Sequence, residues 1–186
     1  MNETLKTILN RRSIRSYKQD QIKEAELQTI IEAGKFAPSA MNQQPWHFVV
    51  VQNKEMLQKI NDTCKVVFAN SDNEHIKARA KAGNSSAFYN APTFIIVFGD
   101  EKAAAPLNDG TLALGNMFLA AESLGIGSCW IHAMSFVFAA EEGNTLKQDL
   151  GVPEGYISIG AAAFGYKASD SPAPLPRKEG TVTIIK

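Results

Sequence analysis

The sequence shows no excess of charge of either sign, since its 186 residues include 19 lysines and arginines and 19 aspartates and glutamates. Proteins that bind nucleic acids through the phosphate backbone carry a basic excess, so this balance argues against that class. No apolar run is long enough to cross a bilayer, and the N-terminus lacks the apolar core of a signal peptide. We therefore expect a cytoplasmic protein with no nucleic-acid or membrane partner.

Cysteine and histidine are scarce. The two cysteines, Cys64 and Cys129, show no metal-site spacing, and the three histidines form no HExxH pattern, so we expect no zinc site. A strand over 127–132 would point Cys129 and His132 to opposite faces, which argues against a Cys/His nucleophile. Two unspaced cysteines suit a reducing compartment, and we expect Cys129 to be a core residue.

The standard phosphate-binding loops are also missing. The segment GAAAFGYK places Tyr166 where a Walker loop needs lysine. The segment GIGSCW places Trp130 where a dinucleotide fingerprint needs its third glycine, and it leads from a helix into a strand, which is the wrong order. A phosphate ligand would therefore have to be held by side chains.

Apolar periodicity predicts several helices in what we expect to be one domain over 1–186. A first helix begins at Asn2, a second runs from about Lys23 until Pro38 stops it, and a uniformly apolar helix covers 107–125. The polar residues 63–90 are ambiguous between short helices and loop.

Four apolar segments predict strands: PWHFVVVQ, which reads as buried on both faces, PTFIIVFGD, SCWIH and EGYISIGAAAFGY. The terminal TVTIIK could add a further strand to a sheet edge. Strands that alternate with helices indicate a sheet covered on both faces.

Arginines are concentrated in RRSIRSY, residues 11–17. Three arginines occur within five residues, and no acidic residue lies between Glu3 and Asp20. Guanidinium groups bind phosphate through paired hydrogen bonds, and Ser13 adds a hydroxyl donor. The alternative is a solvated basic surface, which is where most runs of charged residues are found.

A second unusual stretch is APSAMNQQPW, residues 37–46. Its hydroxyl and amide side chains, from Ser39, Asn42, Gln43 and Gln44, can contact the edges of a heterocycle or a chain of sugar alcohols. The alternative is an ordinary capped turn between a helix and a strand.

Taken together, these segments resemble one family, the FMN-dependent nitroreductases, in a short-chain branch. The resemblance is carried in order by RRSIRSY, APSAMNQQPWHFVVV, YNAPTFIIVFG, LNDGTLALGNMFLAAESLGIGSCWI and PLPRK, and it covers nearly the whole chain. It implies an α+β fold, a three-layer α/β/α sandwich with a mixed, largely antiparallel central sheet.

The resemblance also implies an FMN site, with no catalytic side chain and no metal. Residues that would hold the phosphate and ribityl groups are Arg11, Arg12, Ser13 and Arg15, joined by Arg177 or Lys178. Residues that the partner subunit would lay against the flavin are Pro38, Ser39, Ala40 and Asn42. Residues beside the isoalloxazine would be Trp130, Ile131, His132 and Ala133, and Asn84 would contact the pyrimidine edge.

The family forms homodimers with flavins at the interface, so the resemblance implies the same assembly here. The apolar helix over 107–125 would be buried between subunits, where Gly115 and Ala121 would allow a close approach. The C-terminal segment, about 168–186, would extend over the partner. The chain lacks the added helical excursion of the larger branch and has His132 where that branch has an acidic residue, which leaves the substrate open.

The activity implied is NAD(P)H oxidation with reduction of nitroaromatics, quinones or similar small-molecule electron acceptors, by ping-pong hydride transfer through flavin N5. His132 is the titratable candidate near the ring. Two alternatives remain: an enone reductase or flavin-dependent dehydrogenase on the same scaffold, and an FMN-binding protein without turnover.

Overall fold

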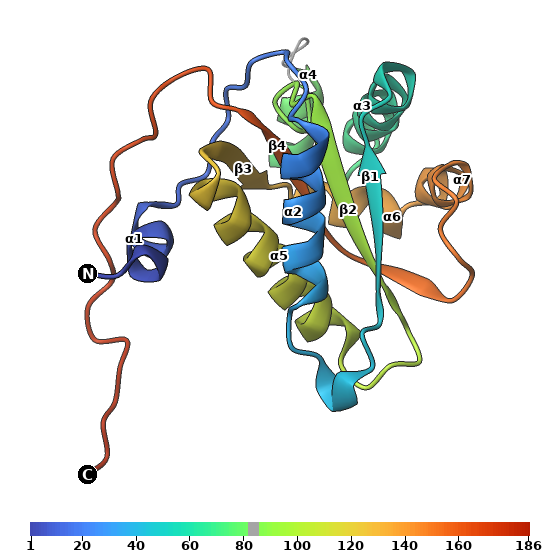
Figure 1. The fold of residues 1–186 in the computed structure, drawn as a ribbon. Coiled ribbons are helices and arrows are strands. Elements are labelled where there is room, and N and C mark those ends of the chain that lie inside the picture. The colour runs from blue at the N-terminus through green and yellow to red at the C-terminus, as the bar shows by residue number, and fades with distance from the viewer. Residues whose placement is uncertain (82–85) are drawn as a thin grey trace.

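A four-stranded antiparallel sheet lies at the centre of the computed structural model, which describes residues 1–81 and 86–186 (Figure 1). Its strands follow the spatial order β1, β2, β4, β3. Their bounds are Trp46–Val51 for β1, Thr93–Asp100 for β2, Ile126–Trp130 for β3 and Tyr156–Tyr166 for β4. The four predicted strands and the largely antiparallel sheet are confirmed.

The central strand β2 is buried as the sequence predicted, but β1 is not. Residues 94–98 of β2 are fully buried, because β2 has a strand on each side and helices over both faces. Strand β1 lies at the edge of the sheet, and five of its six residues are only partly buried. The expectation that β1 is buried on both faces is therefore wrong, since an apolar run does not reveal whether a strand has one neighbour or two.

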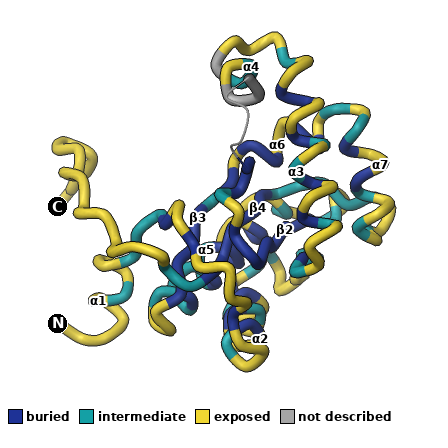
Figure 2. The backbone as a smooth tube through the Cα atoms, turned by 90° about the horizontal axis from the view of Figure 1, so that it is seen from above, coloured by how far each residue is buried: buried dark blue, intermediate teal, exposed yellow. Residues whose placement is uncertain are grey.

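Helices cover both faces of the sheet, which confirms the three-layer architecture (Figures 1 and 2). One face carries α2 (Glu24–Lys35) and α5 (Pro106–Ser123), whose apolar residues Ile30, Leu114 and Met117 pack on it. The other face carries α3 (Lys54–Ala69), α6 (Ala133–Ala139) and α7 (Glu141–Asp149), and α4 (Glu74–Lys81) packs beside α3.

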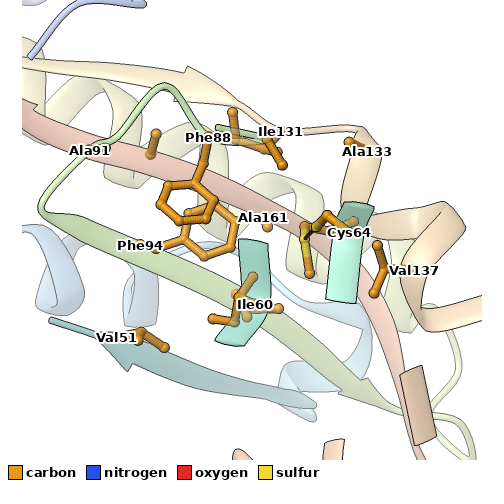
Figure 3. Close-up of a cluster of buried hydrophobic side chains, with 14 of the residues drawn as sticks. Val51, Ile60, Cys64, Phe88, Ala91, Phe94, Ile131, Ala133, Val137 and Ala161 are labelled. Atoms are coloured by element: carbon orange, nitrogen blue, oxygen red, sulfur yellow. Dashed lines mark hydrogen bonds between the residues drawn. The ribbon is translucent and has the colours of Figure 1, made fainter. Parts of the chain in front are cut away.

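Figure 3 shows the second core, to which Ile60 and Cys64 of α3, Val137 of α6 and Phe94 of β2 belong. The sequence left residues 63–90 ambiguous, but the apolar stripe of α3 continues through Cys64, Val67 and Phe68, so this helix extends to Ala69. Within the part of the chain that the structure describes, no helix combines the length and the apolar character needed to span a membrane.

The two ends of the chain lie outside the layers (Figure 2). Helix α1 (Glu3–Asn10) is capped by the predicted Asn2, yet it buries no residue, and Leu5, Ile8 and Leu9 are exposed. Residues 168–186 are exposed coil. The predicted strand TVTIIK is absent there, because this segment runs away from both edges of its own sheet and finds no strand to pair with.

The uniformly apolar helix α5 divides its small residues between two environments. Ala121 is fully buried in the core of its own chain, so the expectation that it faces a partner is wrong. Gly115 is different, because a Cβ atom built there would meet no atom of the described residues within 4 Å. Glycine inside a helix costs about 0.5–1 kcal/mol relative to alanine, and the single chain shows no packing reason for this one.

Candidate functional site

The segment 11–17 lies along the edge strand β3, where Ser13 forms a parallel bridge with Ser128. The backbone N–H of Ile14 donates to the carbonyl of Ser128 at 2.9 Å, and the Tyr17 hydroxyl donates to the Ile14 carbonyl. The buried side chain of Ile14 packs on Gly127, where a Cβ atom would come within 2.9 Å of it. With Ile14 and Tyr17 buried, the segment leaves Arg15 exposed and Arg11 half-buried at the surface.

Two of the three arginines lie over aromatic rings. The Arg11 Cζ atom is 5.8 Å from the ring centroid of Phe118 on α5, and the Arg15 Cζ atom is 5.9 Å from that of Tyr89. Both distances fit a cation–π contact. Within the described ranges 1–81 and 86–186, no ion pair joins any of the three arginines to a carboxylate. The cluster therefore presents positive charge that the chain itself does not neutralise.

Cys129 lies at the base of this cluster. Burial raises the pKa of its thiol, whereas the positive charges of Arg15 and Arg11 and a hydrogen bond with Ser13 act in the opposite direction. Ser13 forms a β-bridge with Ser128, the neighbour of Cys129, and the Ile14 N–H bonds to the same residue. The structure therefore brings Arg11, Ser13 and Arg15, three of the four predicted phosphate-binding residues, together beside β3. The thiol is buried, as the sequence predicted.

Arg12 has a role that sequence reasoning missed. Its Nη1 atom donates to the carbonyls of Leu9 at 2.7 Å and Arg11 at 2.8 Å, so the side chain satisfies carbonyl groups at the end of α1. Its Nε atom is buried and has no hydrogen-bond partner among the described residues. A buried donor without a partner costs about 1–3 kcal/mol, which an anion placed here would recover.

The predicted turn Pro38–Asn42 is held by a residue from another element. The backbone N–H of Ala40 donates to both carboxylate oxygens of Asp109, at 3.1 and 3.2 Å, and Asp109 is buried in the first turn of α5. Ser39 Oγ accepts the backbone N–H of Gln44 at 3.0 Å. The position of Asp109 at the helix start was visible in the sequence, but its contact with the turn was not.

This turn is strained. Met41, Asn42 and Gln44 have φ angles of 52°, 54° and 48°, a region that residues other than glycine seldom adopt. The Met41 side chain is 78% exposed, so it gains nothing from burial in its own chain. Strained backbone of this kind persists where the surroundings demand it, commonly at binding sites.

Within one chain, the turn and the arginine cluster are apart. Ala40 is held at Asp109, whereas Arg11 lies over Phe118, nine residues further along α5. At 1.5 Å per residue this separation is about 13 Å along the helix axis. Figure 1 shows the turn at the lower end of α2 and the arginine segment near α1. The single chain therefore does not assemble the site that the resemblance implies.

The residues Trp130 to Ala133 lie where β3 passes into α6. The Trp130 ring meets Phe118 edge to face at 6.5 Å, so Phe118, which the sequence indicated only as an apolar residue of the long helix, contacts both Trp130 and Arg11. Ile131 and Ala133 are buried, whereas His132 is exposed and meets the Phe136 ring edge to face at 5.6 Å. The structure thus brings the strand end next to the arginine cluster.

Two other predicted residues, Arg177 and Lys178, do not join the cluster. Arg177 and Lys178 are exposed in the C-terminal coil, and no hydrogen bond or ion pair between described residues connects them to the arginine segment. The coil leaves the sheet at Lys167, which pairs with Glu122 of α5 at 3.0 Å. Asn84 lies outside the described residues.

Comparison with known proteins indicates similarity to proteins whose structures contain bound FMN. Residues 8–166 match the model of the family described as "Nitroreductase family". The fold superposes with a TM-score of 0.94 on a nitroreductase with bound FMN from Bacteroides fragilis, which is 40% identical with all of both chains covered. A nitroreductase with bound FMN from Desulfitobacterium hafniense gives a TM-score of 0.90 at 32% identity, again over the whole of both chains. A relative from Archaeoglobus fulgidus, whose name includes NAD(P)H nitroreductase, is 34% identical over 89% of this chain and 86% of its own.

Proposed function

The chain belongs to the nitroreductase family, and on that premise we propose that it is an FMN-dependent NAD(P)H oxidoreductase that reduces nitroaromatics, quinones or similar electrophilic acceptors. The observation that carries the proposal is the arginine cluster at β3, which has no carboxylate partner among the described residues and leaves Arg12 Nε without a hydrogen bond. FMN is bound in the two similar structures from Bacteroides fragilis and Desulfitobacterium hafniense.

The chain's own residues fit the phosphate of this cofactor. Arg11 and Arg15 retain free guanidinium N–H groups beside the Ser13 hydroxyl, and charge-assisted hydrogen bonds to a dianion are about twice as strong as neutral ones. Arg12 would add its unpartnered Nε atom. In this proposal Arg177 or Lys178 completes the phosphate site, and Asn84 contacts the pyrimidine edge.

The flavin ring would lie beside Trp130, Ile131, His132 and Ala133. FMN supplies the chemistry of hydride acceptance and donation between NAD(P)H and the acceptor. The protein binds and orients it, and the exposed His132 is the titratable side chain that could hold a proton near the acceptor. Ping-pong kinetics follow if the nicotinamide and the acceptor use the same face in turn.

The active unit in this proposal is a homodimer. Pro38, Ser39, Ala40 and Asn42 would come from the partner, because within one chain the turn lies about 13 Å along α5 from the arginines. The exposed apolar residues of α1, the open space beside Gly115 and the extended coil over 168–186 support an apolar interface that the single chain leaves uncovered. The C-terminal coil would lie across the partner.

The test is acceptor profiling of the purified protein. We expect it to bind FMN without a covalent bond and to oxidise NADH or NADPH when menadione or a nitroaromatic compound is added, with parallel lines in double-reciprocal plots. Release of FAD, or failure to bind added FMN, would contradict the cofactor assignment. FMN binding without any turnover would leave a flavin-binding protein, and turnover confined to enones would indicate the alternative reductase.

A further inference from the structure

The turn before β2 is strained at two consecutive residues. Tyr89 and Asn90 have φ angles of 60° and 52°, the left-handed region in which a bulky aromatic residue is a rare exception. Strain at such a position persists only when the surroundings hold it, and it commonly serves to direct a side chain.

Hydrogen bonds and packing on both sides fix this turn. The backbone N–H of Ala87 donates to Asn61 Oδ1 on α3 at 3.0 Å, and Phe88 is buried against Phe94 with ring centroids 4.7 Å apart. Ala91 is also buried, as Figure 3 shows beside Phe88 and Phe94. With its neighbours on both sides anchored in the core, the half-buried Tyr89 ring is held at the surface.

At the surface the Tyr89 ring meets Arg15. The Arg15 Cζ atom lies 5.9 Å from the ring centroid, which fits a cation–π contact, and the Tyr89 side chain raises the pKa of Arg15. The contact joins residues 74 positions apart in the sequence. A guanidinium has five N–H donors, and a contact of its plane with a ring leaves them free for an anion.

Arg15 needs such a contact more than its neighbours do. Arg11 is half-buried over Phe118, and Arg12 is bonded to two backbone carbonyls, whereas Arg15 is exposed and has no ion pair among the described residues. A free arginine loses considerable side-chain entropy when it binds a ligand, and a side chain already held loses less.

We propose that Tyr89 is a positioning residue, which holds the Arg15 guanidinium in place to bind the phosphate of the cofactor. This role would explain why the strained Tyr89–Asn90 turn is kept. The inference rests on the proposed function, because FMN is the ligand that Arg15 would bind. Tyr89 acts through Arg15 and needs no contact of its own with the cofactor.

The experiment is a double-mutant cycle on FMN affinity, measured by titrating apoprotein with FMN and following flavin fluorescence. The proteins are the wild type, Tyr89→Leu, Arg15→Ala and the double variant. We expect Tyr89→Leu to raise the Kd about two- to fivefold when Arg15 is present, the range for an exposed cation–π contact, and less than about 1.5-fold in Arg15→Ala. Tyr156→Leu is the matched control, since its ring contacts His47 away from the cluster.

The outcomes separate this inference from the function on which it rests. Equal factors in both backgrounds would assign Tyr89 a purely structural role and overturn the inference, as would an unchanged Kd in Tyr89→Leu. A wild type that does not bind FMN would overturn the proposed function as well. If Tyr89→Leu lowers the unfolding midpoint, Tyr89→Met replaces it in the cycle, and the same comparison applies.

Discussion

The Arg11 guanidinium lies over the ring of Phe118, with 5.8 Å between Cζ and the ring centroid. An arginine at the end of α1 is thereby fixed on α5, the longest helix among the described residues, beside β3. Because Phe118 also contacts Trp130, this contact links the arginine segment to the end of β3.

Replacing Arg11 or Arg15 by alanine should weaken FMN binding by about 1.5–3 kcal/mol each, the range for hydrogen bonds to charged groups. The measurement is a titration of apoprotein with FMN, with urea unfolding to show that the fold is retained. Lys6→Ala is the control, since Lys6 lies on α1 and, among the described residues, pairs only with the exposed Glu3. Undiminished FMN affinity in both arginine variants would show that the cluster is a solvated basic surface and not a phosphate site.

Mixing two inactive chains should restore activity. One chain carries Arg11→Ala and Arg15→Ala, and the other carries Asn42→Glu, which places a carboxylate at the turn. If each site takes its arginines from one subunit and its turn from the other, a mixed dimer has one site with both defects and one with neither. By the symmetry of the interface, activity should recover to about half per heterodimer. A heterodimer that forms and stays inactive would show that each site belongs to one chain.

Gly115→Leu should dissociate the proposed dimer. Gly115→Ala tests whether this face of α5 is free, as it would be in a monomer. In a monomer, alanine there should stabilise the helix by about 0.5–1 kcal/mol, because a Cβ atom meets no atom of the described residues within 4 Å. In a closely packed dimer, leucine should separate the subunits and lower FMN affinity with them. Sedimentation velocity measures the oligomeric state. A dimer unaffected by Gly115→Leu would show that Gly115 of α5 does not lie in the interface.

Asp109→Leu should lower the free energy of unfolding by about 1–3 kcal/mol, because it leaves the Ala40 N–H without its acceptor. Asp109→Asn keeps one carbonyl oxygen and should cost less. Urea unfolding at neutral pH measures both. Equal losses in the two variants would mean that the charge, and not the hydrogen bond to the turn, is what stabilises this position.

Raising the pH above 10 should destabilise the protein through Tyr17. Burial, with the nearby Cys129 and Tyr89, raises the pKa of this phenol above its ordinary value of 10.0. The unfolded chain then ionises while the folded chain does not, so stability present below pH 10 is lost at about 1.4 kcal/mol per pH unit above it. Unfolding of Tyr17→Phe at pH 8 and pH 11 should show a smaller loss than wild type. An equal loss would assign the alkaline sensitivity to other groups.

Local chemistry was enough to predict the elements that bear the site. Asn2 caps α1, Pro38 follows the end of α2, and the apolar run of β2 is fully buried, because capping, backbone restriction and apolar patterning act within a few residues. The cationic character of residues 11–15 was equally visible, since it depends only on which residues are adjacent.

The tertiary structure alone decided what each of these elements meets. That β1 is an edge strand, that Ala121 faces inward, and that Tyr89 lies beside Arg15 all depend on strand order and helix packing across long stretches of sequence. The separation of Ala40 from Arg11 along α5 depends on them too. A sequence pattern records the type of environment that a residue needs, and only the packed chain determines which partner supplies it.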